Sequence, residues 1–143
     1  MKITISKEDF DRIYEHALSE RPDEACGLLA GIDGEDGVRR IQKVYLLTNI
    51  DHTNEHFSID PREQLKAVKD MREKGLQPIG NWHSHPESPS RPSEEDKRLA
   101  NDSKASYLIL SLMDEGNPVL NAFHIESVDG EKTVRKEELV IED

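Results

Sequence analysis

Two histidines and a short acidic run stand close together in the second half of the chain. His83 and His85 flank one serine, and Asp96 closes the run Ser93-Glu94-Glu95-Asp96, which follows a stretch rich in proline and serine. Histidines two positions apart in an extended segment point to the same face, so both imidazoles can reach one ion. Asp96, arriving from the next element, can add a carboxylate oxygen. Because catalytic zinc keeps one position open for water beside three protein ligands, this pattern predicts a zinc-dependent hydrolase.

A zinc hydrolase that cleaves peptide bonds also needs a group that carries protons to the leaving nitrogen, and a buried glutamate suits this role. Glu24 is our candidate because it directly precedes the apolar segment 25–31, where an ionisable group would lie at the edge of a sheet. By spacing alone, Glu24 is only one of 30 acidic residues, so the assignment needs further support.

The segments that must position these residues alternate between helix and strand signals. Ser6 and Asp9 resemble a capping box, Asp60 followed by Pro61 is typical of a helix start, and Asp129-Gly130 is a strong hairpin signal. The expected helices are 7–20, the segment between Asp60 and Gly75, and Ser93 to about 101; the expected strands are 1–5, 25–31, 38–48, 79–83, 107–113, 119–128 and 133–141. This order predicts a mixed α/β fold.

The composition is that of one globular domain spanning residues 1–143, with 34% hydrophobic and 34% charged residues. The start carries no signal-like segment, and no apolar stretch reaches the roughly 18 residues that a membrane helix needs, so we expect a cytoplasmic protein. Cys26 is the only cysteine, which excludes an internal disulfide and a multi-cysteine zinc site. The formal charge of −11 argues against binding to nucleic acid or to anionic membranes.

Three segments together resemble the JAMM metallopeptidase signature of the MPN domain: 24–31 (EACGLLAG), 80–86 (GNWHSHP) and 92–96 (PSEED). Asn49 and the segment 57–61 (FSIDP) extend the similarity over nearly the whole chain. The resemblance implies that His83, His85 and Asp96 bind zinc. It also implies that Glu24 acts first as general base and then as general acid, and that Ser93 donates to the oxyanion.

The resemblance further implies a cytidine-deaminase-like fold, in which helices flank a mixed sheet, and cleavage of peptide or isopeptide bonds after ubiquitin-like tails. The eukaryotic members that remove ubiquitin carry two insertions that shape the recognition of ubiquitin chains, and this compact chain has little room for either. It is more similar to the small bacterial and archaeal members, which are associated with ubiquitin-like sulfur-carrier proteins. The implied substrate is therefore a ubiquitin-like or sulfur-carrier protein, and the implied cofactor is zinc.

Some of these residues also have purely structural explanations. Ser93 is most simply a helix N-cap, and this role can coexist with oxyanion binding because a helix N-terminus favours a developing negative charge. A carboxylate bound to zinc is a poorer cap, so we expect Asp96 not to serve fully in both ways. Asn49 either positions backbone or substrate near the site or stabilises an ordinary turn. Cys26 is expected to be a small core residue.

Three alternatives carry less weight. The segment His52–His56 matches H-x-x-E-H, a zinc signature that works only on a helix, and no apolar helical period surrounds it. We interpret it as a coincidence or as a substrate-facing loop near the site. A non-catalytic MPN module that scaffolds a complex would lack metal ligands, whereas this chain has the complete set. A zinc nucleoside deaminase would need the H-x-E and P-C-x-x-C pattern, which one cysteine cannot supply.

Overall fold

The computed structural model describes residues 2–143. This part of the chain forms seven strands and three helices, in the order β1 (Lys2–Ser6), α1 (Lys7–Glu20), β2 (Cys26–Asp33), β3 (Val38–Leu47), α2 (Pro61–Glu73), β4 (Gln77–His85), α3 (Glu94–Leu99), β5 (Ser106–Ser111), β6 (Val119–Val128) and β7 (Glu131–Glu142). The predicted mixed α/β fold is confirmed. The ends differ by a few residues, since β4 continues to His85 and α3 already ends at Leu99. Met1, the first residue of a predicted strand, lies outside the described residues.

The helices begin at the residues that the sequence marks as caps. The Ser6 hydroxyl accepts a hydrogen bond from the Asp9 amide at the start of α1, and the Asp60 carboxylate accepts one from the Arg62 amide at the start of α2. Between β6 and β7, Asp129 and Gly130 both have positive φ, at 51° and 81°. Two such residues in succession form the tight turn that the Asp-Gly pair predicts.

The sheet closes on itself. Its strand order is β1-β3-β2-β4-β5-β6-β7, and β7 pairs back onto β1. β1 runs parallel to both of its neighbours, β4 and β5 are also parallel, and the other pairs are antiparallel. The sequence predicts a mixed sheet but not this closure, which depends on Lys2–Ser6 pairing with Glu138–Glu142 at the far end of the chain. Closure leaves fewer unpaired strand edges.

Two of the three apolar clusters among the described residues cover opposite faces of the sheet. Helix α1 contributes Phe10, Ile13 and Ala17 to the larger of these two clusters. Helix α2 contributes Ala67 and Met71 to the other. Neighbouring residues of β2 divide between the two, because Leu29 packs in the α1 cluster and Ala30 in the α2 cluster. Trp82 of β4 is fully buried in the α1 cluster, and its ring N–H donates to the Tyr45 carbonyl at 3.1 Å.

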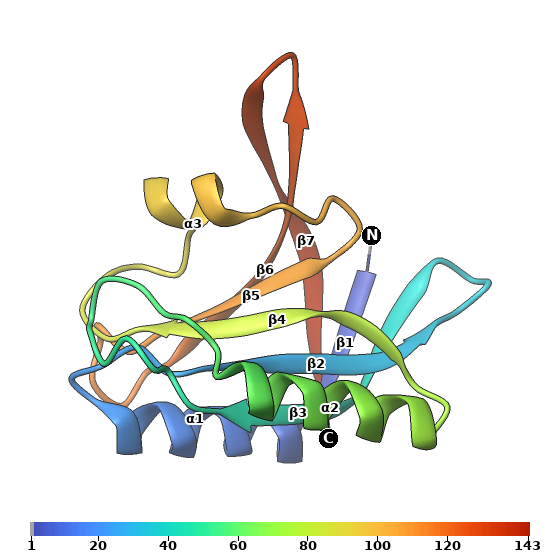
Figure 1. The fold of residues 1–143 in the computed structure, drawn as a ribbon, viewed down its shortest axis with the longest axis horizontal. Helices are drawn as coiled ribbons and strands as arrows, with labels where there is room; N and C mark the ends of the chain where they lie inside the picture. Colours follow the sequence, from blue (N-terminus) through green and yellow to red (C-terminus); the bar gives the residue numbers. More distant parts are fainter. Residues whose placement is uncertain (1) are drawn as a thin grey trace.

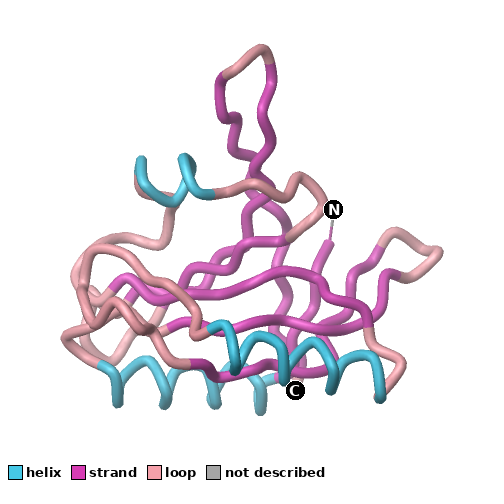
Figure 2. The backbone as a smooth tube through the Cα atoms, in the orientation of Figure 1, coloured by secondary structure: helices cyan, strands magenta, loops and turns pink. Residues whose placement is uncertain are grey.

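Two loops and α3 gather near the end of β4. In Figure 1 the loop 48–60 (green) and the loop 86–93 (yellow) lie at the left, where the arrow of β4 ends. α3 follows the second loop directly. Figure 2 shows the β6–β7 hairpin extending beyond the rest of the sheet, on the side of the sheet where α3 also lies. Residues from distant parts of the chain therefore surround His83 and His85.

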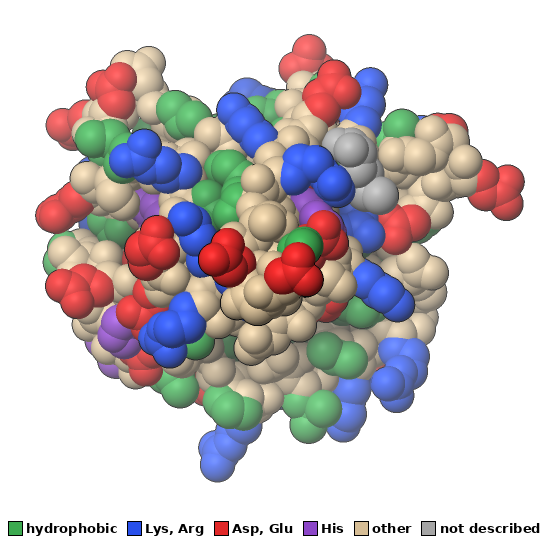
Figure 3. Space-filling model, turned by 90° about the horizontal axis from the view of Figure 1, so that it is seen from above, with side chains coloured by type: hydrophobic (Ala, Val, Ile, Leu, Met, Phe, Trp, Pro, Cys, Tyr) green, Lys and Arg blue, Asp and Glu red, His purple; other side chains and the backbone are tan. Residues whose placement is uncertain are grey.

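The surface carries charges of both signs. On the face shown in Figure 3, acidic and basic side chains are interspersed rather than gathered into one block of either sign. Within residues 2–143, no helix combines the length and the apolar character that crossing a membrane requires.

Candidate metal centre

The two histidines of β4 are held by strands on both sides. His83 lies opposite Cys26 of β2 and Ile109 of β5, and His85 lies opposite Ser111 of β5. Both histidines are buried, with 3% and 4% of their surface exposed. Because they are two positions apart in a strand, their rings project from the same face, as the sequence predicts.

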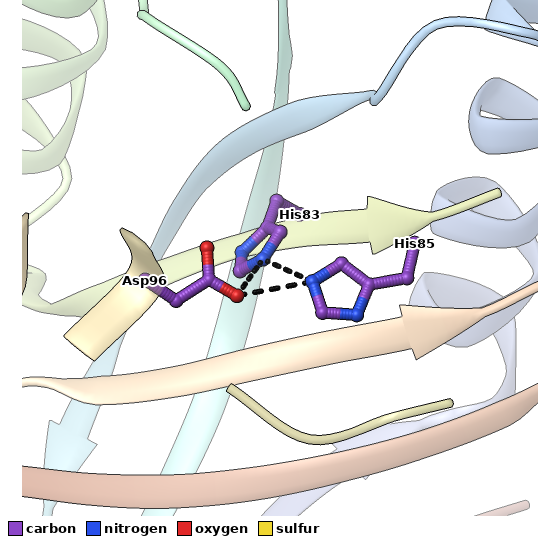
Figure 4. Close-up of side chains that lie close together, drawn as sticks. All are labelled: His83, His85 and Asp96. Carbon is purple, nitrogen blue, oxygen red and sulfur yellow. Dashed lines mark hydrogen bonds and ion pairs between the residues drawn. The ribbon is translucent and has the colours of Figure 1, made fainter. Parts of the chain in front are cut away.

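Asp96 joins these rings from the first turn of α3. His83 Nε2 lies 3.1 Å from His85 Nε2, and the Asp96 Oδ2 atom lies 3.2 Å from the first and 3.0 Å from the second (Figure 4). Among the described residues, these three form the one group of His, Cys, Asp or Glu side chains placed to hold a metal ion. The three residues that the sequence predicts as ligands therefore lie together in space.

The spacing and chemistry of these three atoms fit a zinc ion. Ligand atoms about 2.0 to 2.2 Å from a tetrahedral zinc ion lie about 3.3 to 3.6 Å from one another. The observed separations are slightly shorter than this, so small outward movements of the side chains would admit the ion. Two imidazole nitrogens and one carboxylate oxygen are also a donor set that suits zinc.

His85 is oriented by a carbonyl in the loop that follows it. Its Nδ1 lies 2.9 Å from the Pro89 carbonyl oxygen, which can only accept a hydrogen bond. Nδ1 therefore carries the proton, and Nε2 keeps a free lone pair for a metal. The loop is itself tied to the sheet, because the Ser111 hydroxyl donates to the carbonyl that precedes Pro89, the Ser90 hydroxyl donates to a β5 carbonyl, and the Asn121 amide donates to the Ser90 carbonyl.

His83 is oriented by packing instead. Its Nδ1 is buried and has no hydrogen-bond partner among the described residues, while its ring stacks on Phe57 with centroids 4.7 Å apart and planes inclined by 26°. Burial lowers the pKa of His83, although Asp96 opposes this effect. The sequence analysis gave Phe57 no role. The sequence could have indicated a role for Phe57, because this aromatic residue begins the segment 57–61 that extends the resemblance.

Glu24 is a buried carboxyl beside this group. Only 3% of the residue is exposed, and its Oε1 has no hydrogen-bond partner among the described residues. Burial raises the pKa of Glu24 to about 8; the charge of His85 opposes the shift, and those of Asp96 and Glu95 add to it. A carboxyl with a pKa in this range can both accept and release a proton near neutral pH. The proposed role in proton transfer is chemically consistent with this environment.

Ser93 and Asp96 cap α3 in both directions. The Ser93 hydroxyl accepts a hydrogen bond from the Asp96 amide at 3.0 Å, and Asp96 Oδ2 accepts one from the Ser93 amide at 2.9 Å. This Oδ2 is also the atom that faces both histidines. Despite burial, hydrogen bonds from His83 and His85 hold the pKa of Asp96 well below its usual range. One oxygen of Asp96 therefore reaches both histidines and the Ser93 amide. The expectation that zinc binding weakens the cap stays a prediction.

An apolar cavity of about 270 Å³ adjoins the three candidate ligands. His83 and Asp96 line it, and its apolar lining consists of Phe57, Ile59, Leu99, Ala100, Tyr107, Ile109 and Ile125. A larger hollow of about 580 Å³ lies toward the other end of β4. Its buried Arg39 already donates to Asp33 and Ser106, so we place the chemistry in the smaller cavity.

The competing motif is not helical. His52 has a positive φ of 47°, and the segment from His52 to His56 is an irregular loop with a bend at residues 54 and 55. His56 Nδ1 contacts Asp51 Oδ2 at 3.0 Å, and His56 also lines the cavity beside the metal group. Among the two interpretations of this segment, the geometry favours a loop near the site.

Asn49 and Cys26 are both buried, with different consequences. The Asn49 amide nitrogen donates to the Glu24 carbonyl at 3.0 Å and to the His56 carbonyl at 3.1 Å, so both open interpretations of Asn49 apply: it holds backbone near the site and it stabilises a loop. Cys26 is a free cysteine within β2, as expected. Burial raises the pKa of its thiol to about 12, which keeps it protonated and unreactive.

The sequence has relatives among known proteins. Residues 6–126 match a family described as prokaryotic homologs of the JAB domain. The chain is 35% identical over 118 residues to a CysO-cysteine peptidase of Mycobacterium tuberculosis, which covers 82% of this chain and 77% of that protein. It is 28% identical over 115 residues to a desampylase of Haloferax volcanii, covering 77% of this chain and 81% of that one.

Solved structures resemble the fold. A solution structure of a protein from Desulfitobacterium hafniense has a TM-score of 0.87 and 49% identity, covering 99% of this chain and 93% of that one. The crystal structure of a JAB1/MPN domain protein from Archaeoglobus fulgidus has a TM-score of 0.53 and 26% identity, covering 98% of this chain and 99% of the other. Both similarities extend over essentially all of the described elements.

Proposed function

The chain belongs to the prokaryotic JAB domain family, and on that premise we propose that it is a zinc metallopeptidase. Its substrates are peptide or isopeptide bonds at the C-terminal glycine of ubiquitin-like or sulfur-carrier proteins. The relatives named CysO-cysteine peptidase and desampylase support hydrolysis at proteins of this class. The observation that carries the proposal is the buried, unpartnered Glu24 carboxyl next to the group formed by His83, His85 and Asp96.

His83, His85 and Asp96 would hold the zinc ion. When bound, zinc acts as a Lewis acid that makes a water molecule more acidic and polarises a carbonyl group. Glu24 would ionise more readily beside such a cation, because a nearby positive charge opposes the effect of burial on its pKa. The rest of the reaction depends on two side chains of the protein, Glu24 and Ser93.

Glu24 moves one proton. In its ionised form, its carboxylate takes a proton from the attacking water while the water oxygen bonds to the carbonyl carbon of the substrate. The bond between this carbon and the nitrogen then breaks, and Glu24 returns the proton to the leaving nitrogen. The carboxylate is regenerated, and the products are a free carboxyl terminus and an amine.

Ser93 stabilises the negative charge that develops on the carbonyl oxygen. Its Oγ accepts from the Asp96 amide, so the hydroxyl hydrogen is not used in that bond and can be donated to the substrate. A donor held in place by a helix cap needs little reorganisation during the reaction, which is the basis of oxyanion stabilisation.

Two finer assignments accompany this proposal. We assign residues 1–143 to one JAMM/MPN domain, and we describe its fold as cytidine-deaminase-like. A scaffold module without catalysis, the alternative function, would require neither a buried unpartnered acid nor three converging ligands beside a cavity.

The proposal is tested with the purified protein and small carriers that end in Gly-Gly from the same genome. Metal analysis should find about one zinc per chain. Each carrier is then prepared with a short C-terminal extension and followed by intact mass. We expect loss of the extension from at least one carrier, with cleavage directly after the second glycine. A zinc-loaded protein that leaves every carrier and conjugate intact would refute the proposal.

A further inference from the structure

The backbone of Glu24 is held by hydrogen bonds on both sides, whereas its side chain is not. Its Oε1 makes no hydrogen bond to any described residue, so no hydrogen bond from another side chain fixes this oxygen in place. Glu24 also precedes β2, which begins at Cys26, so regular strand pairing does not reach it. A proton carrier must nevertheless be held within a fraction of an ångström of its working position. The hydrogen bonds that hold the backbone around Glu24 therefore contribute to where the carboxyl lies.

Ser84 makes one of these bonds. It lies between the two histidines of β4, has no exposed surface, and stands next to Ala25 at the end of the β2–β4 ladder. The Ser84 amide donates to the Ala25 carbonyl at 2.9 Å, and the Ala25 amide donates to the Ser84 hydroxyl at 2.8 Å. In an ordinary antiparallel pair both bonds use main-chain atoms. Here the serine side chain supplies the second acceptor, directly after Glu24.

Asn49 makes a second bond from the opposite direction. Its amide nitrogen donates to the Glu24 carbonyl at 3.0 Å, and its Oδ1 accepts from the amides of Asp51 and Ser58. The Glu24 amide donates in turn to the Thr53 carbonyl at 2.8 Å. Asn49 is only 7% exposed, so these bonds are shielded from competing water. The loop 48–60 is thereby connected directly to the residue proposed as the base.

We propose that Ser84 and Asn49 are positioning residues that fix the Glu24 carboxyl relative to the ligands on β4. Ser84 belongs to the same strand as His83 and His85, so its bond to the Ala25 amide connects the proposed base to the proposed ligands through one short piece of backbone. The inference rests on the proposed function of Glu24. Neither Ser84 nor Asn49 is required to touch the substrate.

The test compares Ser84→Ala and Asn49→Ala with the parent protein. Ser84→Thr keeps the hydroxyl and is the conservative rescue. Ser106→Ala is the matched control, because Ser106 is also a buried serine whose side chain makes hydrogen bonds, but its partners are Arg39 and Glu137, away from Glu24 and the candidate ligands. For each variant we measure kcat, KM and zinc affinity, and we follow hydrogen exchange of the Ala25 amide by NMR.

We expect kcat of Ser84→Ala and Asn49→Ala to fall by about tenfold to a hundredfold, with KM and zinc affinity close to those of the parent. The Ala25 amide should exchange roughly fivefold to tenfold faster in Ser84→Ala. Ser84→Thr should bring both kcat and the exchange rate of the Ala25 amide back toward the values of the parent. Ser106→Ala should leave kcat unchanged. If Ser84→Ala lost only zinc affinity, Ser84 would position the ligands and not Glu24, and the proposal would be overturned.

The two proposals fail in different ways. If the parent cleaves its substrate and Ser84→Ala is equally fast although its Ala25 amide has lost protection, the positioning role is wrong and the proposed function stands. If the zinc-loaded parent cleaves no carrier, the proposed function fails, and the positioning role fails with it even where Ala25 exchange responds as expected. The exchange measurement reports whether the bond is present without any reference to turnover.

Discussion

Ser93 and Asp96 hold each other through two reciprocal hydrogen bonds, one from each backbone amide to the other side chain. The same Asp96 oxygen lies 3.2 Å from His83 Nε2 and 3.0 Å from His85 Nε2. The first turn of α3 therefore fixes the third candidate ligand and the proposed oxyanion donor as one unit. A change at Ser93 should consequently affect the stability of the helix and the reaction, and these two effects can be separated.

Replacing Ser93 tests this unit. Ser93→Ala removes the cap and the hydroxyl donor, so we expect the free energy of unfolding to fall by about 1 kcal/mol and kcat to fall by roughly a hundredfold. Ser93→Asn keeps a good N-cap and should recover most of the stability without recovering the rate to the same extent. Urea unfolding and turnover are measured on the same samples. Equal recovery of both quantities in Ser93→Asn would argue that Ser93 acts only as a cap.

Replacing Glu24 tests the proton carrier. Glu24→Gln preserves the shape of the side chain and removes its basic form, so we expect turnover to fall by about a hundredfold to ten-thousandfold while zinc remains bound. Glu20→Gln at the end of α1 is a suitable control, since its carboxyl is 43% exposed and lies outside the site. A Glu24→Gln protein that cleaves as fast as the parent, with contaminating protease excluded, would show that another group moves the proton.

Glu24 should also make the metal-free protein less stable as the pH rises. Burial raises the pKa of Glu24 from 4.5 to about 8 in the folded state. The folded protein therefore binds this proton more tightly than the unfolded chain does. The resulting stabilisation is fully present below pH 4.5 and is lost as the pH rises toward 8. In chelator, Glu24→Gln should therefore gain stability relative to the parent across this window, by roughly 2 to 4 kcal/mol at its upper end. Urea unfolding at several pH values measures this change. A difference in the free energy of unfolding between Glu24→Gln and the parent that stayed constant with pH would contradict the prediction.

The second histidine pair provides a separate test of the metal assignment. His52 and His56 lie in a non-helical loop, and the three converging ligands are elsewhere. The double variant His52→Ala/His56→Ala should therefore keep its zinc, whereas His83→Ala should lose most of it. Metal analysis after gel filtration distinguishes the two results. Loss of zinc from the double variant, with His83 and His85 intact, would move the site to the loop.

Local signals in the sequence were sufficient for most of the fold. The caps at Ser6 and Asp60 and the hairpin at Asp129-Gly130 depend only on neighbouring residues, and each appears where it was predicted. The group His83, His85 and Asp96 could be found as well, because a strand and the next helix suffice to bring its members together.

Closure of the sheet and the bonds around Glu24 could not be predicted in this way. Closure joins β1 to β7 across nearly the whole length of the chain, and no local pattern encodes this pairing. The bonds of Ser84 and Asn49 join side chains to backbone groups 59 and 25 positions away. The sequence shows only a serine between two histidines and an asparagine near a turn, and both have simpler interpretations without the third dimension.

The loop 86–93 should control how tightly zinc is held. The Pro89 carbonyl accepts from His85 Nδ1, and the Asn121 amide donates to the Ser90 carbonyl in the same loop at 3.1 Å. Asn121→Ala should loosen this loop and the orientation of the His85 ring. Direct partners of metal ligands typically contribute tenfold to a hundredfold in affinity. Because Asn121 acts on such a partner only through the loop, we expect zinc affinity to fall by a smaller factor, up to about tenfold. Competition with a chromophoric chelator measures the change.

Asn117→Ala is the matched control for this prediction, since Asn117 is exposed in the connection just before β6 and its side chain makes no hydrogen bond within residues 2–143. It should leave zinc affinity unchanged. Asn121→Ala should still fold, because the backbone pairing of β6 with β5 does not depend on this side chain, and circular dichroism checks this point. If zinc affinity were equal in both variants and the parent, the Asn121 bond would not be needed to orient His85, and the prediction would be wrong.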